Sequence, residues 1–353
     1  MDAAASYVPV RVLDMIGVDL NVYRFDYDLT FAVLLMNGDG TIYHRYGSRN
    51  SANASDRLSM TSLVRLLRET LADHAAYTAQ PAPKPAMPRR VVEEIPPLAR
   101  KIARRTREGK KQECIHCHTV NDTERDFERE QKRWSREATI GMWPRPEKIG
   151  LTLDRDEPRR VLAVAPDSAA FRAGIREGDR IERAGEEQVR SEADLQWALE
   201  KAPSGPAEVA IEYRRGEGPP VRAVIQLKEG WKLASELEFS WRASMWELRP
   251  RPGFGGREVA PEKRAGLGLA AAGMALEVTY IVDWGDDAAT GENIKKAGLR
   301  KGDVVLSVAG KSDFASELHF QTWFRYTRKP GERVEFEVLR DGARRKLEIT
   351  VLQ

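Results

Sequence analysis

The sequence has no long hydrophobic run. No apolar stretch approaches the roughly 18 residues that a membrane-spanning helix needs, so we predict no transmembrane segment. A secretory signal is also missing, because Met-Asp-Ala-Ala-Ala-Ser contains no basic stretch that leads into an apolar one. Neither charge dominates: 57 lysines and arginines stand against 54 aspartates and glutamates, a net charge of +3. This balance argues against a dedicated nucleic-acid binder.

Cysteine is scarce, and the two cysteines of the chain stand close together. They are Cys114 and Cys117, and His118 follows directly, in the order Cys-Ile-His-Cys-His. This spacing is typical of covalent c-type haem attachment, in which both thiols form thioethers with the porphyrin. His118 would then be the axial iron ligand, and Met142 is a candidate for the sixth position. We therefore predict haem c as a cofactor.

Other roles for this segment stay open. Met87 and His74 are alternative sixth ligands. Without haem, Cys114 and Cys117 form a Cys-x-x-Cys pair, and a helix start would lower the pKa of one thiol and favour thiol exchange. Zinc is less favoured because so short a loop leaves the tetrahedral site incomplete. Haem attachment predicts a periplasmic or otherwise extracytoplasmic location, and without haem we expect a cytoplasmic one.

An internal repeat is the strongest sign of domain organisation. Residues 173–181, Ala-Gly-Ile-Arg-Glu-Gly-Asp-Arg-Ile, reappear at residues 297–305 as Ala-Gly-Leu-Arg-Lys-Gly-Asp-Val-Val. We expect Asp179 and Asp303 to bond local backbone at the turn into the next strand. Two similar units of roughly 85–90 residues indicate tandem domains rather than a solenoid of short repeats.

Both copies have the same expected order of elements. A short apolar strand precedes the repeated segment, a helix follows it, and two paired strands end the unit. These elements are expected at residues 161–164, 192–201, 208–214 and 221–227, and at residues 276–282, 315–326, 333–339 and 345–352. Asp341-Gly342 is typical of the hairpin turn in the second copy.

A glycine-containing apolar loop stands in each copy before the repeated segment. With the repeated Ala-Gly and Gly-Asp pairs, these loops make residues 146–230 and 262–353 resemble bacterial-type PDZ domains. The resemblance implies peptide binding, in which the loop amides face a terminal carboxylate and the strand that follows accepts a peptide strand. The predicted peptide-binding residues are Ile149, Gly150, Leu151, Thr152, Leu153, Gly266, Leu267, Gly268 and Leu269.

The first 77 residues have a different pattern. The expected order is strand, helix, strand, hairpin turn, strand and amphipathic helix, at residues 7–13, 19–25, 30–36, 37–40, 41–46 and 59–77. This order resembles the second half of a thioredoxin fold. The resemblance implies an earlier helix that bears a Cys-x-x-Cys pair. This chain has no residues at the place of that helix, so this half is expected to be a truncated domain.

The middle of the chain is basic and helical. A proline-rich linker at residues 81–88 leads to a basic helical stretch at residues 98–111, and Asn121 is a candidate N-cap for a charged helix at residues 121–137. Stacking aromatics are not interleaved with the basic residues. We therefore predict a solvated or haem-facing helix and no nucleic-acid partner.

The complete order resembles a bacterial family of thioredoxin/PDZ-domain proteins, some of which are selenoproteins. The predicted fold class is α+β and multidomain, with a truncated thioredoxin-like half, a helical Cys-x-x-Cys-His segment and two PDZ-like domains. The predicted boundaries are residues 1–77, 78–145, 146–230, 231–261 (a tryptophan-rich connector) and 262–353. In selenocysteine-containing members the redox pair lies further upstream, so we expect Met1 to be an internal start.

Three functions follow from this organisation. The first is a tandem PDZ protein that binds partner peptides or C-termini and couples them to a haem or redox segment, with a redox partner. The second is a thiol-disulfide oxidoreductase-like protein whose active-site region is missing. The third is a scaffold or adaptor without redox activity. A trypsin-like protease is excluded, because no Gly-x-Ser-x-Gly occurs and the block before residue 146 is too short.

Overall fold

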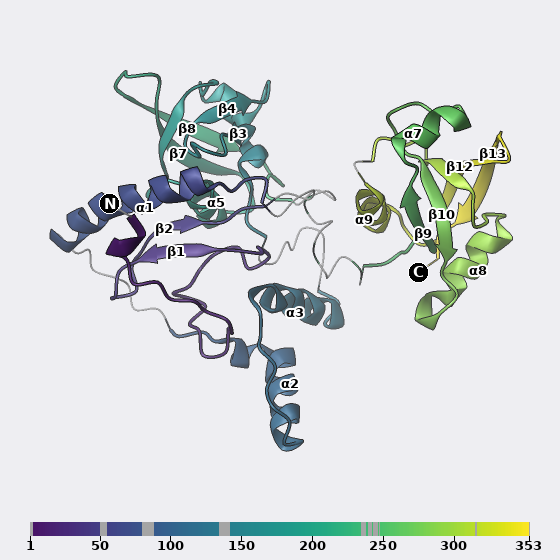
Figure 1. Ribbon diagram of the computed structural model, residues 1–353, viewed down its shortest axis with the longest axis horizontal. Coiled ribbons are helices and arrows are strands. Elements are labelled where there is room, and N and C mark those ends of the chain that lie inside the picture. The colour runs from purple at the N-terminus through teal and green to yellow at the C-terminus, as the bar shows by residue number, and fades with distance from the viewer. Residues whose placement is uncertain are drawn as a thin grey trace. The chain divides into compact units, whose positions relative to one another are not determined.

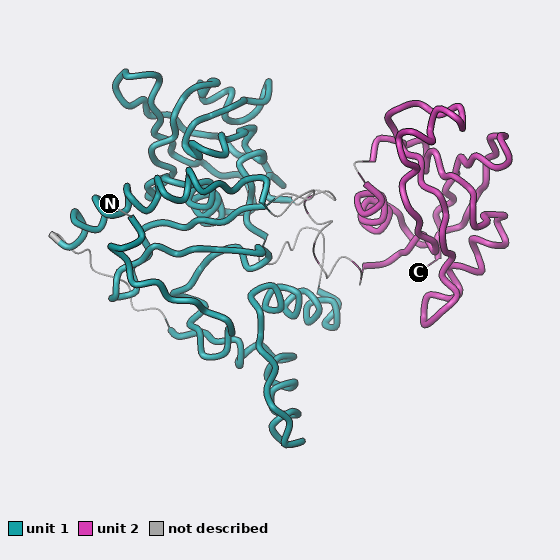
Figure 2. Tube along the Cα trace, in the orientation of Figure 1, with its two compact units in different colours: residues 1–234 teal, residues 235–353 magenta. Residues whose placement is uncertain are grey.

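The computed structural model describes residues 3–49, 55–79, 88–133, 142–233, 238, 242, 246, 248–314 and 316–352. The chain forms two compact units, residues 1–234 and residues 235–353 (Figure 2). The first unit holds an N-terminal part, residues 3–133, and the first repeat domain; the second unit holds the second repeat domain (Figure 1). In the described part of the chain, no helix is both long and apolar enough to span a bilayer.

A β-hairpin and a long helix build the N-terminal part. β1 (Val33–Met36) pairs antiparallel with β2 (Ile42–Tyr46) across the turn at residues 37–40. α1 (Met60–Ala79) packs on this hairpin through a small core centred on Leu66, which is fully buried. The predicted hairpin and the predicted amphipathic helix are confirmed.

The two elements expected before the hairpin are not formed. Residues 7–13 belong to no strand, and Pro9 in their middle removes one of the donors that a sheet ladder needs. Residues 19–25 form turns instead of a helix, because the Asp19 carboxylate accepts a hydrogen bond from the Asn21 N–H at 2.9 Å. The strand and helix that a thioredoxin-like start requires are therefore absent from this stretch.

Two further helices follow in the N-terminal part. α2 (Pro96–Arg107) is the predicted basic helix, and α3 (Cys117–Glu130) is the predicted charged one. The expected N-cap of α3 is wrong: the helix begins four residues earlier, with His116 in the extended cap conformation. Asn121 lies inside the helix and is buried, so its side chain does not start the helix.

The first repeat domain has two small sheets around one core. β3 pairs with β4, and β6, β5, β7 and β8 form a four-stranded sheet in that order. Its elements are η3 (Pro146–Ile149), β3 (Leu151–Leu153), β4 (Val161–Val164), α4 (Ala169–Arg172), β5 (Arg180–Ala184), β6 (Glu187–Gln188), α5 (Glu192–Lys201), β7 (Ala207–Arg214) and β8 (Pro220–Leu227). Leu195 and Leu199 of α5 are fully buried in this core.

The second repeat domain has one five-stranded sheet, in the order β13-β12-β11-β10-β9. Its elements are β9 (Phe254–Glu258), α7 (Pro261–Arg264), η5 (Ala265–Leu267), β10 (Leu276–Ile281), η6 (Gly285–Asp287), α8 (Ala288–Lys296), β11 (Val304–Val308), α9 (Glu317–Thr327), β12 (Arg333–Arg340) and β13 (Ala343–Thr350). Since β9 belongs to this sheet, the domain begins before residue 262, the boundary expected from the sequence.

The repeated Gly-Asp segment has the same polar contacts in both domains. The carboxylate of Asp179 accepts hydrogen bonds from the Arg176 N–H and from the Arg215 guanidinium. The carboxylate of Asp303 accepts the corresponding bonds from the Arg300 N–H and the Arg340 guanidinium. The prediction that both aspartates bond local backbone is confirmed.

Main-chain hydrogen bonds show which positions of the two domains correspond in the strands that precede this segment. The Ala165 N–H donates to Gly150 O at 2.8 Å in the first domain, and the Val282 N–H donates to Gly253 O at 2.9 Å in the second. Both glycines have positive φ angles, +88° and +79°. Gly150 therefore corresponds to Gly253, and β3 corresponds to β9.

Candidate peptide-binding site

The outer edge of β3 has unused main-chain groups. Gly150 O accepts a bond from the β4 side, and the Asp154 N–H donates to the same side, to Arg160 O. Because main-chain groups alternate along a strand, Leu151 and Leu153 direct theirs to the opposite edge. No described residue forms a hydrogen bond with those groups, which we call the β3 edge. A strand edge of this kind is able to accept a peptide strand.

Gly150 sets the turn into the β3 edge. A Cβ at this position would lie 2.1 Å from the Ser168 Cβ, a separation that real Cβ atoms do not reach. Ser168 in turn caps α4, since its hydroxyl accepts a hydrogen bond from the Phe171 N–H. The positive φ and this close approach together require glycine, so the loop is held against the start of α4.

In the second domain a helix bonds the corresponding edge. The Gln321 side-chain amide on α9 donates to Phe254 O at 2.9 Å. The Gly256 N–H donates to the Glu317 carboxylate at 3.0 Å. By the alignment above, Phe254 and Gly256 correspond to Leu151 and Leu153. The equivalent edge in this domain, the β9 edge, is therefore already bonded to α9.

The helix that corresponds to α9 is α5. Both helices begin with a serine N-cap followed by glutamate, and both have a glutamine four residues after that glutamate. Glu192 and Gln196 thus correspond to Glu317 and Gln321. The α5 side chains that would face the β3 edge are therefore Glu192 and Gln196.

Glu192 does not bond β3, because the N-terminal part holds its carboxylate. Oε1 accepts a hydrogen bond from the Ser48 hydroxyl at 2.7 Å, and Oε2 pairs with Arg57 at 3.1 Å. Burial raises the pKa of Glu192, and the charge of Arg57 opposes that rise. Arg57 also pairs with Glu147 of η3, so one guanidinium spans from α5 to the turn before β3.

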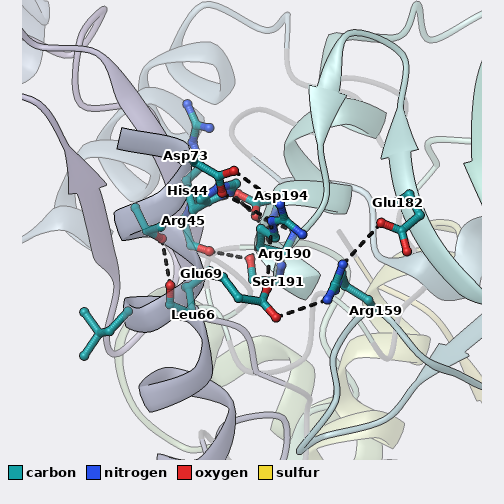
Figure 3. A network of polar contacts seen from close by, with 12 residues as sticks. His44, Arg45, Leu66, Glu69, Asp73, Arg159, Glu182, Arg190, Ser191 and Asp194 are labelled. Atoms are coloured by element: carbon teal, nitrogen blue, oxygen red, sulfur yellow. Dashed lines mark hydrogen bonds and ion pairs between the residues drawn. The ribbon is translucent and has the colours of Figure 1, made fainter. Parts of the chain in front are cut away.

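His44 on β2 is the centre of the contact with α5 (Figure 3). Its Nδ1 lies 2.9 Å from Asp194 of α5, and its Nε2 lies 2.9 Å from Asp73 of α1. Burial alone would lower the pKa of His44, but the two carboxylates outweigh it and raise the pKa to about 9. The ring is therefore a protonated imidazolium near neutral pH, donating from both nitrogens.

The partners of His44 are themselves held in place. Burial alone would raise the pKa of Asp73, but hydrogen bonds from His44 and Arg190 lower it to about 2. The Arg45 N–H donates to the other oxygen of Asp194 at 2.8 Å, and the Ser191 hydroxyl donates to Arg45 O. We call His44, Asp73, Arg190, Asp194 and Arg45 the interdomain network; Figure 3 shows that its members converge from β2, α1 and the start of α5.

Further contacts join the N-terminal part to the β3 side of the first domain. Arg159 pairs with Glu69 of α1 at 3.1 Å, and the Arg155 Nε donates to Leu58 O at 2.6 Å. Leu151 is 0% exposed, main chain included. The N-terminal part thus contacts both α5 and the loop that follows β3.

The structure places the predicted peptide-binding residues in two different settings. Ile149, Gly150, Leu151, Thr152 and Leu153 form the end of η3, the turn and β3, as expected. Gly266, Leu267, Gly268 and Leu269 do not precede a strand: they follow α7 in a 3-10 turn, and the next strand begins at Leu276. The expectation of a strand directly after Leu269 is wrong, because Gly268 adopts a left-handed conformation that ends η5 as a local turn.

The Cys-His segment lies at the start of α3. Cys114 is exposed, while the Cys117 thiol is half-buried and donates to Leu29 O at 3.7 Å. Burial raises the pKa of Cys117, so the expected lowering of a thiol pKa by the helix start is wrong for this residue. His118 is exposed, stacks on His116 and lies 3.7 Å from Asp122.

Two of the other predicted ligands lie in other elements of the first unit. Met142 is buried at the start of the segment that leads into η3, next to Trp143, which stacks on Trp197 of α5. His74 on α1 lies 2.8 Å from the Tyr43 hydroxyl. Met87 lies outside the described residues. Over the described ranges, no group of three or more His, Cys, Asp or Glu side chains is arranged to hold a metal ion.

The sequence did not reveal the interdomain network. His44 and Asp194 are 150 positions apart, and their residue types are common in strands and at helix starts. One local signal was present: Ser191 and Asp194 form a capping box, which places the start of α5. That signal predicts the helix but not the imidazole that contacts it.

Comparisons with known proteins agree with the repeat. Residues 147–220 and residues 289–351 match the PDZ domain family model. No curated protein matches the chain. The solved structures that are similar include the HtrA-type protease AlgW with decapeptide (17% identity, TM-score 0.24, 49% of this chain and 54% of that one) and a variant of it with decapeptide (17% identity, TM-score 0.26, 55% and 54%). This chain thus spans about half the length of those structures, and the family matches alone identify the two repeat domains as PDZ domains.

Proposed function

We propose that this protein is an adaptor that binds an extended peptide segment by strand addition to the first PDZ domain. The observation that carries the proposal is the β3 edge, where the main-chain groups of Leu151 and Leu153 have no hydrogen-bond partner among the described residues. The Gly150 turn beside this edge supports binding of a peptide that ends there. The Gly150 N–H donates to Glu147 O, but the Leu151 N–H that follows has no partner among the described residues and is available to a carboxylate.

We further propose that the N-terminal part is a cover for this edge. Glu192 of α5 is held by Ser48 and Arg57, and the same arginine reaches Glu147 beside the β3 turn. A peptide strand between β3 and α5 would have to displace these contacts. The protein then exists in a closed form and an open form, and peptide binding selects the open one.

The second PDZ domain is assigned a structural role in this proposal. Its β9 edge is bonded to Gln321 and Glu317 of its own helix, so strand addition there would break two hydrogen bonds before forming new ones. The apparent affinity of that edge for an extended peptide is lowered accordingly. Its loop equivalent to the Gly150 turn is at Gly253, and not at residues 266–269.

A pair of histidine variants tests the cover. His44→Ala removes the imidazolium between Asp73 and Asp194, whereas His74→Ala removes a histidine of α1 that bonds Tyr43 and not α5. A pooled library of short peptides with free carboxyl ends, added to the full chain, should bind His44→Ala about tenfold more tightly than His74→Ala or the unsubstituted protein. Equal binding by all three proteins would contradict the cover.

Hydrogen exchange tests the binding edge without any substitution. A bound peptide strand should protect the amide hydrogens of Leu151 and Leu153 and leave those of Phe254 and Gly256 unchanged. Protection at the second pair alone would overturn the assignment of the first domain as the peptide binder. Because this measurement uses the unsubstituted chain, it remains decisive if His44→Ala does not fold.

Haem attachment and thiol exchange stay predictions, and the adaptor does not depend on them. The half-buried Cys117 thiol with its raised pKa favours a function without redox activity. Intact-mass spectrometry of chain produced with cytochrome c maturation machinery tests the alternative: a mass increment equal to one haem would establish attachment at Cys114 and Cys117. The truncated thioredoxin-like domain and the extracytoplasmic location also stay predictions.

A further inference from the structure

Arg325 is a buried cation on α9 of the second PDZ domain. The residue is 7% exposed, and it makes no ion pair with any described carboxylate. Its Nη1 donates to Gln321, to the main-chain oxygen at 3.0 Å and to Oε1 at 2.6 Å. Its Nε–H is buried and has no hydrogen-bond acceptor. One donor of this guanidinium is therefore left unused inside the protein.

The surroundings of Arg325 add positive charge. Its guanidinium lies 5.2 Å from the centre of the Trp246 ring, and Arg249 and Arg251 lie nearby, both paired with Asp287 of η6. Burial, followed by the charges of Arg251 and Arg249, lowers the pKa of Arg325 to about 9. Asp287 is thus shared by two arginines and does not pair with the third.

An arrangement of this kind is costly without an anion. Buried charges in proteins are normally paired, because desolvation of an unpaired ion costs several kcal/mol. A carboxylate or phosphate oxygen beside Arg325 would accept the unused Nε–H and offset the repulsion from the neighbouring arginines. Guanidinium groups suit such oxyanions because their donors match the spacing of the oxygens.

We propose that Arg325, with Arg249 and Arg251 beside it, forms a binding site for an oxyanion, either a carboxylate or a phosphate group. The aromatic ring of Trp246 covers one side of the guanidinium. The site does not rest on strand addition to the first domain, but it shares Gln321 with the β9 edge, because the amide that donates to Phe254 O also accepts from Arg325.

Nitrogen-detected NMR of the full chain tests the site through the Arg325 Nε–H. Millimolar sodium phosphate or sodium acetate should shift this resonance along a saturating curve and raise the melting temperature of the second domain by a few degrees. Sodium chloride at equal ionic strength should do neither. The same shift in chloride, or no shift with any of the three salts, would overturn the proposal.

Two arginine variants provide the controls. Arg325→Met removes the buried charge together with the Nε–H that the NMR titration follows, so its readout is the melting temperature of the second domain, which phosphate and acetate should no longer raise. Arg328→Met removes the next arginine of the sequence, which already pairs with Glu332, and should retain them. If Arg325→Met does not fold, the titration of the unsubstituted protein still decides. If phosphate and acetate raise the melting temperature of Arg325→Met as much as that of the unsubstituted chain, the assignment is contradicted.

The source of the oxyanion is resolved by three peptides of one sequence. A peptide with a free carboxyl end, its amide, and its amide carrying a phosphoserine separate a terminal carboxylate from a phosphate. Binding of the first but not the second indicates a C-terminal carboxylate; binding of the third but not the second indicates a phosphate group. Binding of all three equally would mean that no oxyanion is recognised, which would overturn the proposal.

Discussion

In the first PDZ domain, Glu192 bonds Ser48 of the N-terminal part, whereas in the second the corresponding Glu317 bonds Gly256 of its own strand. The glutamines differ in the same way. Gln321 donates to the main chain of β9, while Gln196 borders a small cavity beneath the hairpin of the N-terminal part. One helix pattern, glutamate and a glutamine four residues later, thus serves a contact between domains in one case and within a domain in the other.

The two strands also differ in sequence. β9 contains Gly255 and Gly256, and a Cβ at Gly256 would lie 2.0 Å from Glu277 O of the neighbouring strand. β3 has Thr152 and Leu153 at the corresponding positions, and Leu153 fills the core. Glycine at position 256 therefore permits the close pairing of β9 with β10, whereas β3 pairs with β4 while holding side chains at both positions. Two domains with the same scaffold thus differ in their binding edges: the β9 edge is bonded to its own helix, and the β3 edge is not.

The largest effect is expected at the glycine turns that both domains have. Gly150→Ala and Gly253→Ala should each lower the free energy of unfolding by about 4 kcal/mol, because a positive φ is combined with a close approach to Ser168 and to Thr290. Gly178→Ala is the control: its φ is also positive but nothing lies within 4 Å, so about 1 kcal/mol is expected. Urea unfolding measures all three. Losses at Gly150 and Gly253 no larger than that of the control would break the alignment of the turns.

The next largest effect is a difference between the two units in how their free energy of unfolding depends on pH. The folded-state pKa of His44 is raised from 6.5 to about 9, so its stabilisation is complete below pH 6.5 and is lost as pH rises through 9. The loss should reach about 3 kcal/mol, since each unit of pKa difference corresponds to about 1.4 kcal/mol. This loss should appear in the unfolding of the first unit. The second unit should instead gain stability above pH 9, because the pKa of its Arg325 is lowered to about 9 in the folded state.

His44→Gln and His74→Gln are the matched variants for this pH dependence. The slope of the urea midpoint of the first unit between pH 6 and pH 10 should become much smaller in His44→Gln and should be kept in His74→Gln. A smaller slope remains near pH 9, because burial raises the pKa of Cys117. A slope in His44→Gln as steep as that in His74→Gln would show that another group carries the pH dependence, and the interdomain network would lose its assigned charge state.

Much of this fold could be predicted from the sequence, because its signals are local. The turn at residues 37–40, the helix at residues 192–201 and the repeated Gly-Asp turns each need only neighbouring residues to be recognised. β9 could not be found in this way. Its sequence, Phe-Gly-Gly-Arg-Glu, has little strand propensity, and it is a strand only because β10 pairs with it.

In the candidate site, too, the features that depend on neighbouring residues were predicted, and the contacts between residues far apart in the sequence were not. Gly150 and the strand after it were predicted, since a glycine followed by alternating apolar residues is a local pattern. The residues at 266–269 have the same pattern but no strand beside them. The contact of His44 with Asp194 was not predicted, because which residue faces α5 depends on the path of the chain 150 positions away. Spacing in the sequence contains no information about that contact.

A smaller loss in the free energy of unfolding is expected when the buried aspartates of the repeated Gly-Asp segments are replaced. Asp303→Asn should cost about 3 kcal/mol and Asp179→Asn about 2 kcal/mol, because removing one partner of a buried ion pair leaves the other charge unpaired. The difference arises from the arginines: Arg340 is 14% exposed at its side chain, whereas Arg215 is 57% exposed and recovers solvation. Urea unfolding measures both. Equal losses would mean that the arginine's exposure does not matter.

The smallest effect tests the edges directly. Gln321→Met removes the amide that bonds Phe254 O and should cost about 1 kcal/mol, the usual net value of one hydrogen bond. Gln196→Met removes the corresponding amide of α5 and should change stability by less, since that amide does not bond β3. The decisive readout is hydrogen exchange with the peptide library present: Gln321→Met should begin to protect the Gly256 amide, and Gln196→Met should leave it as it was. If Gln321→Met gains no protection, the β9 edge is closed by the shape of its glycine strand and not by the glutamine.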